Sequence, residues 1–156
     1  TEAFDHTPEE ADTLVRDNYA GTVVMGSATA NISGSEYFGN TQVGIEVFGT
    51  PGPKASISDT VVAGNGGGWG IGAEASPGMA VKLRAARIVV TNHDNGITAW
   101  SGGGTAAVWL SDSVVSGNTT GLLQSGAGAT FHSLGNNAVV DNGTNATGTI
   151  TSAAPM

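Results

Sequence analysis

Three of the five basic side chains in this chain fall within six consecutive positions, at Lys82, Arg84 and Arg87. Trp109 follows about one repeat further along, at the outward position of its own strand-like run. Lys and Arg pair with carboxylates, and an indole ring packs against the flat faces of sugars, so these residues have the chemistry to hold an acidic glycan. The alternative is that the cations only solubilise a strand and that Trp109 packs beneath a loop at 101–105.

Asp59 and Asp112 occupy the same position of a repeated turn, and Arg87 lies in the repeat between them. A polysaccharide lyase needs a cation, or carboxylates that hold one, to neutralise a uronate, and a basic group to remove a proton. Asp59, Asp112 and Arg87 together contain these groups. Asp59 and Asp112 are therefore included among the predicted substrate-binding residues. A surface salt bridge is the simpler interpretation. Asp12 occupies the same turn position with no basic residue near it, so an aspartate here is a feature of the repeated turn. No residue is assigned a catalytic role.

The three histidines, His6, His93 and His132, include no pair at metal-ligand spacing, and the chain has no cysteine. We therefore expect no metal site and no cofactor. His93 and Asp94 are either a catalytic pair or ordinary solvated turn residues, and the turn is the simpler interpretation. His132 is expected to face the core or an end layer.

Repeats of about 25 residues must position all of these side chains. An asparagine after a strand-like run recurs with spacings of 22, 25, 27, 26 and 24 residues, at Asn18, Asn40, Asn65, Asn92, Asn118 and Asn142. Three positions before these stand Val15, Tyr37, Val62, Val89, Val115 and Val139, and eight or nine before stand Ile32, Ile57, Leu83, Leu110 and Leu134. A column of small polar residues five positions before is expected at Thr13, Ser35, Thr60, Ser113 and Asn137. Each repeat is thus expected to hold three short strands separated by turns.

A unit of this length cannot cover its own apolar face, whereas stacked copies align like residues into buried columns. The sequence therefore predicts an all-β fold, a right-handed parallel β-helix with three-strand coils and about six rungs. The asparagines would form a ladder at one turn, and a one-residue bulge is expected where Leu83 precedes Asn92 by nine positions. The chain would be a single domain, 1–156, with an irregular segment at 1–11, stacked coils at 12–150 and a tail at 151–156. A short helix starting near Thr7 is the alternative for part of the first segment.

Strings such as SDTVVAGN and SDSVVSGN, and the terminal HSLGNNAVVDNGTNATGTITSAAPM, are similar to those of bacterial right-handed parallel β-helix repeat proteins of the pectate-lyase-like superfamily. The resemblance covers 12–156 and is to the C-terminal coils of proteins that are usually longer. It implies a secreted or periplasmic location. It implies the fold strongly and an activity weakly, because this fold hosts lyases, hydrolases, epimerases and adhesins. No residue matches the aspartate constellation of pectate lyases or polygalacturonases.

The charge balance narrows the possible partners. Thirteen acidic against five basic residues give a net charge of -8, which argues against general binding to nucleic acid or to anionic membranes, and no segment is long and apolar enough to span a bilayer. Six of the acids lie in the first 17 residues. Their negative charge would repel another copy and so guard an uncapped N-terminal end of the β-helix against stacking. Alternatively, a second copy covers that end, which predicts self-association.

Two functions are consistent with these features of the sequence. The first is a β-helix module with a carbohydrate-binding or structural role at the cell envelope or outside the cell, with no identifiable catalytic constellation. The second is a polysaccharide-active enzyme, a lyase or hydrolase on acidic glycans, that uses the basic and aromatic surface groove.

Overall fold

A computed structural model describes residues 2–4, 9–64 and 66–153 as short parallel strands joined by turns. Sheet A contains β1 (Glu2–Phe4), β4 (Ala20–Val24), β7 (Val43–Phe48), β10 (Trp69–Ala75), β13 (Asn95–Ser101), β16 (Thr120–Ser125) and β19 (Thr144–Thr147). Sheet B contains β2 (Glu9–Ala11), β5 (Thr29–Ser33), β8 (Lys54–Ser58), β11 (Ala80–Ala86), β14 (Thr105–Ser111), β17 (Ala129–Leu134) and β20 (Ile150–Ala153). Sheet C contains β3 (Leu14–Arg16), β6 (Glu36–Phe38), β9 (Val61–Ala63), β12 (Val89–Thr91), β15 (Val114–Ser116) and β18 (Ala138–Val140). The described residues include no helix with the length and apolar character needed to cross a membrane.

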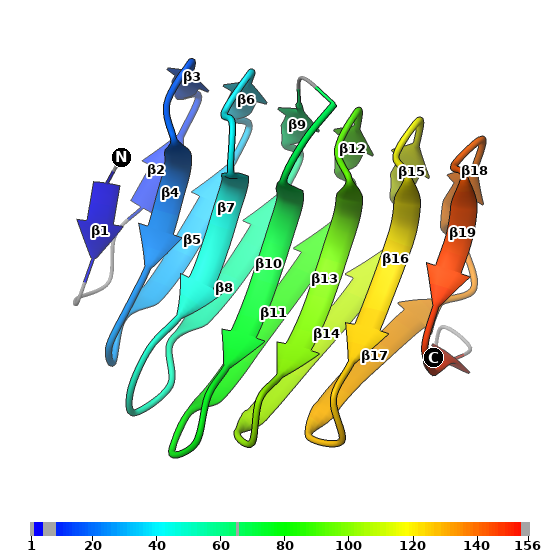
Figure 1. Cartoon of the computed structure of the whole chain (residues 1–156). Helices are drawn as coiled ribbons and strands as arrows, with labels where there is room; N and C mark the ends of the chain where they lie inside the picture. The colour runs from blue at the N-terminus through cyan, green and yellow to red at the C-terminus, as the bar shows by residue number, and fades with distance from the viewer. Residues whose placement is uncertain (1, 5–8, 65, 154–156) are drawn as a thin grey trace.

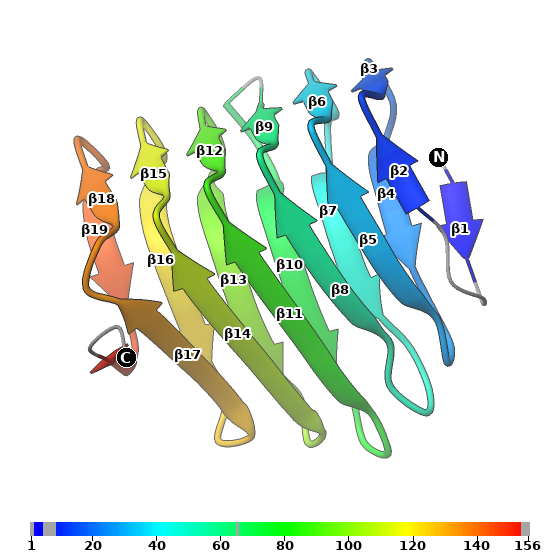
Figure 2. The ribbon, with the colours of Figure 1, turned by 180° about the vertical axis from the view of Figure 1, so that it is seen from behind.

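Each coil visits sheets A, B and C in that order, and every strand pairs in parallel with its equivalents in the neighbouring coils. In Figure 1 the strands of sheet A descend in front and those of sheet B rise behind them while the chain advances from its N-terminus to its C-terminus. Figure 2 shows the same winding from behind. The coil is therefore right-handed, and the predicted parallel β-helix with three-strand coils and about six rungs is confirmed.

Two of the predicted segment limits differ from the structure. In the segment before Asp12, β1 pairs with β4 and β2 pairs with β5, so its described part belongs to the first coil instead of being irregular. Thr7 and Pro8, where the alternative helix would begin, lie outside the described residues, and Glu9–Ala11 is a strand. At the other end β20 continues sheet B to Ala153, past the expected limit of the coils.

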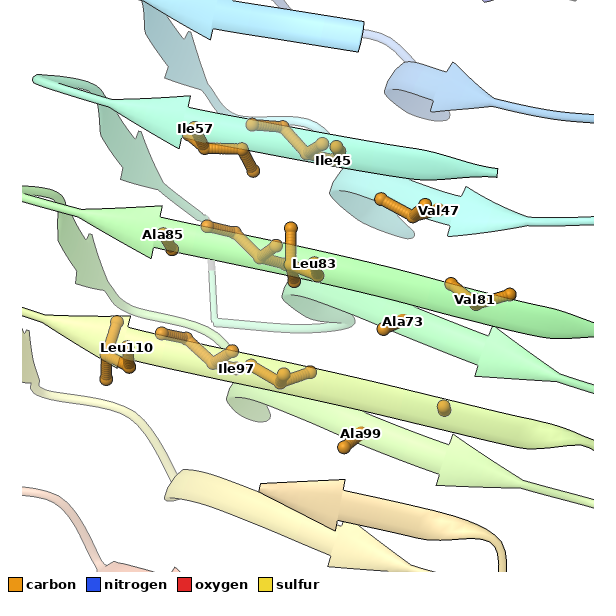
Figure 3. Packing of buried hydrophobic residues seen from close by; sticks show 14 of the residues in the cluster. Ile45, Val47, Ile57, Ala73, Val81, Leu83, Ala85, Ile97, Ala99 and Leu110 are labelled. Atoms are coloured by element: carbon orange, nitrogen blue, oxygen red, sulfur yellow. The ribbon is translucent and has the colours of Figure 1, made fainter. Parts of the chain in front are cut away.

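The core is built from aliphatic side chains stacked in register along the axis. In sheet A, Ile45, Ile71 and Ile97 lie over one another and are fully buried, and Figure 3 shows how such side chains fill the space between the sheets. Burying one such side chain stabilises the fold by roughly 1.5–3 kcal/mol relative to leaving it exposed. The repeat must therefore be regular, because only equivalent positions of successive coils stack on one another in the core.

The predicted alignment of the fourth coil is wrong by one or two positions. Val90, not Val89, stacks on Val62 and Val115, and Val89 points outward with 37% of its surface exposed. The equivalent of Ile57 and Leu110 is Ala85, and Leu83 lies two residues earlier in the strand, between Ala55 and Val108. Sequence reasoning chose the larger aliphatic residue, but Leu83 and Ala85 both face the core.

This change of alignment removes the expected bulge. His93, not Asn92, occupies the asparagine position, and Ala85 precedes His93 by the same eight residues that separate Leu110 from Asn118. The extra residue lies in the last coil instead. Ser133 pairs with Leu110, and Leu134 lies one position beyond the column in which it was expected.

The asparagine ladder exists, with His93 in place of one amide. Three of the side-chain oxygens accept a hydrogen bond from a backbone N–H of the preceding coil: the N–H of Asn18 donates to Asn40 at 3.1 Å, that of His93 to Asn118 at 3.0 Å, and that of Asn118 to Asn142 at 3.0 Å. Asn65 lies outside the described residues. Asn92 sits in the left-handed region, with φ 61°, and its amide donates to the Gly64 carbonyl instead.

The predicted column of small polar residues is confirmed as a second ladder. The N–H of Thr13 donates to the hydroxyl of Ser35, and the N–H of Ser113 donates to the amide oxygen of Asn137. Ile88 fills the position in the fourth coil, where its N–H donates to Ser113 but its own side chain accepts nothing. The two ladders satisfy backbone groups that the turns between sheets would otherwise leave unpaired.

Close approach of successive coils also explains the glycine at the second position of most strands of sheet A. A Cβ on Gly44 would lie 2.6 Å from the Gly70 carbonyl oxygen, and a Cβ on Gly96 would lie 2.6 Å from that of Gly121. Any side chain here would push two coils apart, so the glycine is required by packing between backbones.

One of the acids expected to guard the N-terminal end is instead buried there. Glu10 is 7% exposed, and its carboxylate accepts hydrogen bonds from the hydroxyls of Tyr37 at 2.5 Å and Thr22 at 3.2 Å. This polar cluster closes the described N-terminal end of the apolar core by hydrogen bonding.

Candidate functional site

The predicted site residues divide between one sheet face and one turn. Along β11, Val81, Leu83 and Ala85 are buried while Lys82 and Arg84 point outward, as the period of two requires. The parallel register places Arg84 beside Ser56 in β8 and Trp109 in β14, and Trp109 beside His132 in β17. Lys82, Arg84 and Trp109 therefore share the outer face of sheet B, as the sequence predicts.

Arg84, Trp109 and His132 form a stacked row across three coils. The Arg84 guanidinium carbon lies 5.4 Å from the centroid of the indole, and the rings of Trp109 and His132 lie 5.5 Å apart at 17°. The indole stands between its two in-register neighbours, so its faces are already engaged and it does not offer the open platform for a sugar ring that was predicted. It instead holds Arg84 in place, a contact that contributes about 0.5–1 kcal/mol at an exposed site.

A groove follows this face. One hollow of about 400 Å³ is bordered by Arg84, Trp109 and Leu134, and a second of about 320 Å³ by Lys54, Lys82 and Arg84. Ser56 and Arg84 border both hollows, so the two lie next to each other on this face and together make up the groove.

Sequence reasoning missed two members of this face. Lys54 pairs in register with Lys82, and His132 points outward although it was expected to face the core or an end layer. Outward alternation in the correct register would have identified both, because Ala55 and Phe131 beside them are buried.

Asp59, Arg87 and Asp112 form the predicted column in the turn beyond this face, each with a left-handed φ between 50° and 53°. Arg87 donates from Nε and Nη2 to the two carboxylate oxygens of Asp59 at 2.7 and 2.8 Å. These hydrogen bonds lower the pKa of Asp59 and raise that of Arg87. Asp112 accepts a hydrogen bond from the Asn136 amide. None of the three lines the groove, so the geometry supports the salt-bridge interpretation over a catalytic trio.

His93 was expected in a solvated turn, and this prediction is wrong. It is 3% exposed, while Asp94 is exposed, so the two do not form an accessible catalytic pair. Neither ring nitrogen has a hydrogen-bond partner among the described residues. Burial lowers the pKa of His93; the backbone of Val62 and Gly67 and the charge of Asp94 oppose this, although neither backbone group meets hydrogen-bond geometry.

Potential metal ligands are dispersed over the structure. Across residues 2–4, 9–64 and 66–153, no three His, Asp or Glu side chains gather in an arrangement that could hold a metal ion.

The fold and this face define a right-handed parallel β-helix with a basic groove on sheet B. No protein-family model matches the chain, and neither a curated protein nor a solved structure matches it. The class therefore rests on the winding, the register and the ladders described above.

Proposed function

We propose that this β-helix is a non-catalytic module that binds acidic polysaccharide along the outer face of sheet B, at the cell envelope or outside the cell. The carrying observation is the placement of charge: the chain has a net charge of -8, yet Lys54, Lys82 and Arg84 line one hollow on this face. The resemblance of the repeats to the pectate-lyase-like superfamily supports a carbohydrate ligand.

The groove suits a linear polyanion. Its cations come from two adjacent coils, which in parallel sheets lie about 4.8 Å apart, so successive carboxylates of a uronate chain can each meet one. Arg84 is already ordered by Trp109, and this reduces the entropy lost when it pairs with a ligand.

The enzyme alternative has weaker support. Arg87, the basic member of the predicted trio, is committed to Asp59 by two hydrogen bonds and lies outside the groove lining. A lyase would need an unpaired base beside the bound uronate.

Isothermal titration with an oligogalacturonate tests the proposal. Combined Lys82→Ala and Arg84→Ala substitutions should weaken binding by roughly tenfold or more, which corresponds to at least about 1.4 kcal/mol. Arg16→Ala is the matched control, because it removes one positive charge from sheet C, where Arg16 is ion-paired to Asp17.

A loss in the control that equals the loss in the double variant per charge removed would mean that only net charge matters, and unchanged affinity in the double variant would exclude this groove. Release of unsaturated uronate products by the parent protein, lost in Arg87→Ala, would favour the lyase instead.

A further inference from the structure

The outer face of sheet A carries a different set of side chains, two glutamates among aromatic rings. Phe48, Glu74 and Trp100 lie in register across three adjacent strands. Glu46 is on the same face, in register with Gly72, which lies two residues before Glu74 in β10. Both carboxylates are thus half-buried within an aromatic surface.

The indole of Trp69 lies over Gly72, where a Cβ would be 2.8 Å from its Cε3 atom. The ring therefore lies against the sheet beside both glutamates. Tyr19, Trp69, Glu46 and Glu74 line a cleft of about 100 Å³. Tyr19 is 71% exposed, so one aromatic wall of this cleft is open to a ligand.

Three polar groups of this face have no partner among the described residues. Among the described residues, no hydrogen bond or ion pair reaches either carboxylate. Burial, and then repulsion from Glu74, raises the pKa of Glu46, and burial raises the pKa of Glu74. Thr98, in register with Gly72 on the far side from Glu46, points outward between the core residues Ile97 and Ala99. Its hydroxyl is fully buried and has no partner in the described part of the chain.

The charge of this face determines the kind of ligand. None of the five Lys and Arg residues lies on a strand of sheet A, so no Lys or Arg side chain from these strands neutralises the two carboxylates. A positively charged group would relieve their repulsion and could lie over an aromatic ring at the same time.

We propose that this cleft binds a primary ammonium group carried on a sugar ring, so that its ligand is an oligosaccharide of amino sugars with free amines. Glu46 and Glu74 pair with the ammonium group, and the exposed rings of Tyr19 and Trp69 pack against the sugar. Trp100 and Phe48, one strand to either side of Glu74, extend the aromatic surface for neighbouring sugars. The site is on another sheet from the basic groove and does not depend on it.

Titration with a β-linked glucosamine tetramer at about pH 6 tests the proposal. The protein should bind this probe at least roughly tenfold more tightly than the fully N-acetylated tetramer, which has the same rings without the charge. Combined Glu46→Gln and Glu74→Gln substitutions should remove this preference, and Tyr19→Ala should weaken binding of both tetramers. Tyr19 is exposed, so its variant is expected to fold normally.

Two controls make the result specific. Glu36→Gln removes one negative charge from sheet C and should leave binding unchanged, as should Lys82→Ala with Arg84→Ala in the sheet B groove. Equal binding of the N-acetylated tetramer, equal binding of tetralysine, or full affinity in the double glutamate variant would overturn the proposal. These results would leave the oligogalacturonate experiment unaffected.

Discussion

At the scale of single residues, buried polar side chains hold the turns of this β-helix. Asn118 is 3% exposed and accepts a hydrogen bond from His93 N–H, while its amide donates to the Val90 and Ser116 carbonyls at 3.2 and 3.1 Å. One side chain thus connects two neighbouring coils. His93 fills the equivalent place one coil earlier without forming comparable side-chain hydrogen bonds within the described residues.

Asn118→Ala should therefore destabilise the protein by about 1–3 kcal/mol, because the N–H of His93 is left buried and unpaired. Urea unfolding followed by circular dichroism measures the change. Thr119→Ala, at the next position, should have little effect. Similar midpoints for the two variants would show that the ladder contributes little to stability.

Glu46→Gln should stabilise the protein near neutral pH. The pKa of Glu46 is raised above its usual 4.5 in the folded protein. The protonated Glu46 side chain therefore contributes to the free energy of unfolding. This contribution is complete below the pKa of Glu46 in the unfolded chain and is lost as pH rises through its pKa in the folded protein. The variant avoids this loss, so its advantage over the parent should appear near pH 7 and vanish near pH 4 in paired urea unfolding experiments. Glu36→Gln is the exposed control, and an advantage that persists at low pH would contradict this cause.

At the scale of elements, stacking in register decides which face of each three-residue strand is buried. In β15 the side chain of Val115 is fully buried, whereas Val114 beside it is 39% exposed. Val115 stacks on Val90 and Val139 in the neighbouring coils. A shift of one residue would therefore exchange the core and the surface of the strand.

Val115→Asp should prevent folding, because an unpaired buried charge costs several kcal/mol against a total stability of about 5–15 kcal/mol. Val114→Asp introduces the same side chain one position away and should leave a folded protein. Circular dichroism and thermal melting distinguish the two. A cooperative melt of Val115→Asp close to that of the parent would show that the assigned register of sheet C is wrong.

At the scale of the whole molecule, each coil contacts only its neighbours, so local stability depends on position along the axis. In sheet A, β13 pairs with strands on both sides, whereas β19 pairs only with β16 among the described strands and all of its residues are exposed. The two proposed binding faces are also a property of the whole molecule. The same stacked coils present a basic groove on sheet B and an acidic aromatic cleft on sheet A.

Amide hydrogen exchange should accordingly be slowest in β10 and β13 and fastest in β19, because an end coil can open without disturbing the rest. Mass spectrometry of peptides covering these strands measures the difference. Equal protection along the whole chain would indicate that the β-helix opens as a single unit or that its ends are covered by another copy.

The sequence by itself determined the architecture: the recurring asparagine, the valine three positions before it and the glycine after it identify the coils, because in-register stacking forces like residues to recur. It also determined the outward alternation that brings Lys82, Arg84 and Trp109 to one face. Only the tertiary structure decided the alignment of the fourth coil, since Asn92 and His93, or Leu83 and Ala85, are equally consistent with local patterns and differ only in which one meets its neighbours. It likewise decided that Arg84 and His132 take up both faces of Trp109 and that Glu46 and Glu74 share a cleft. These contacts join residues about one coil apart in the chain, and the register between coils fixes them.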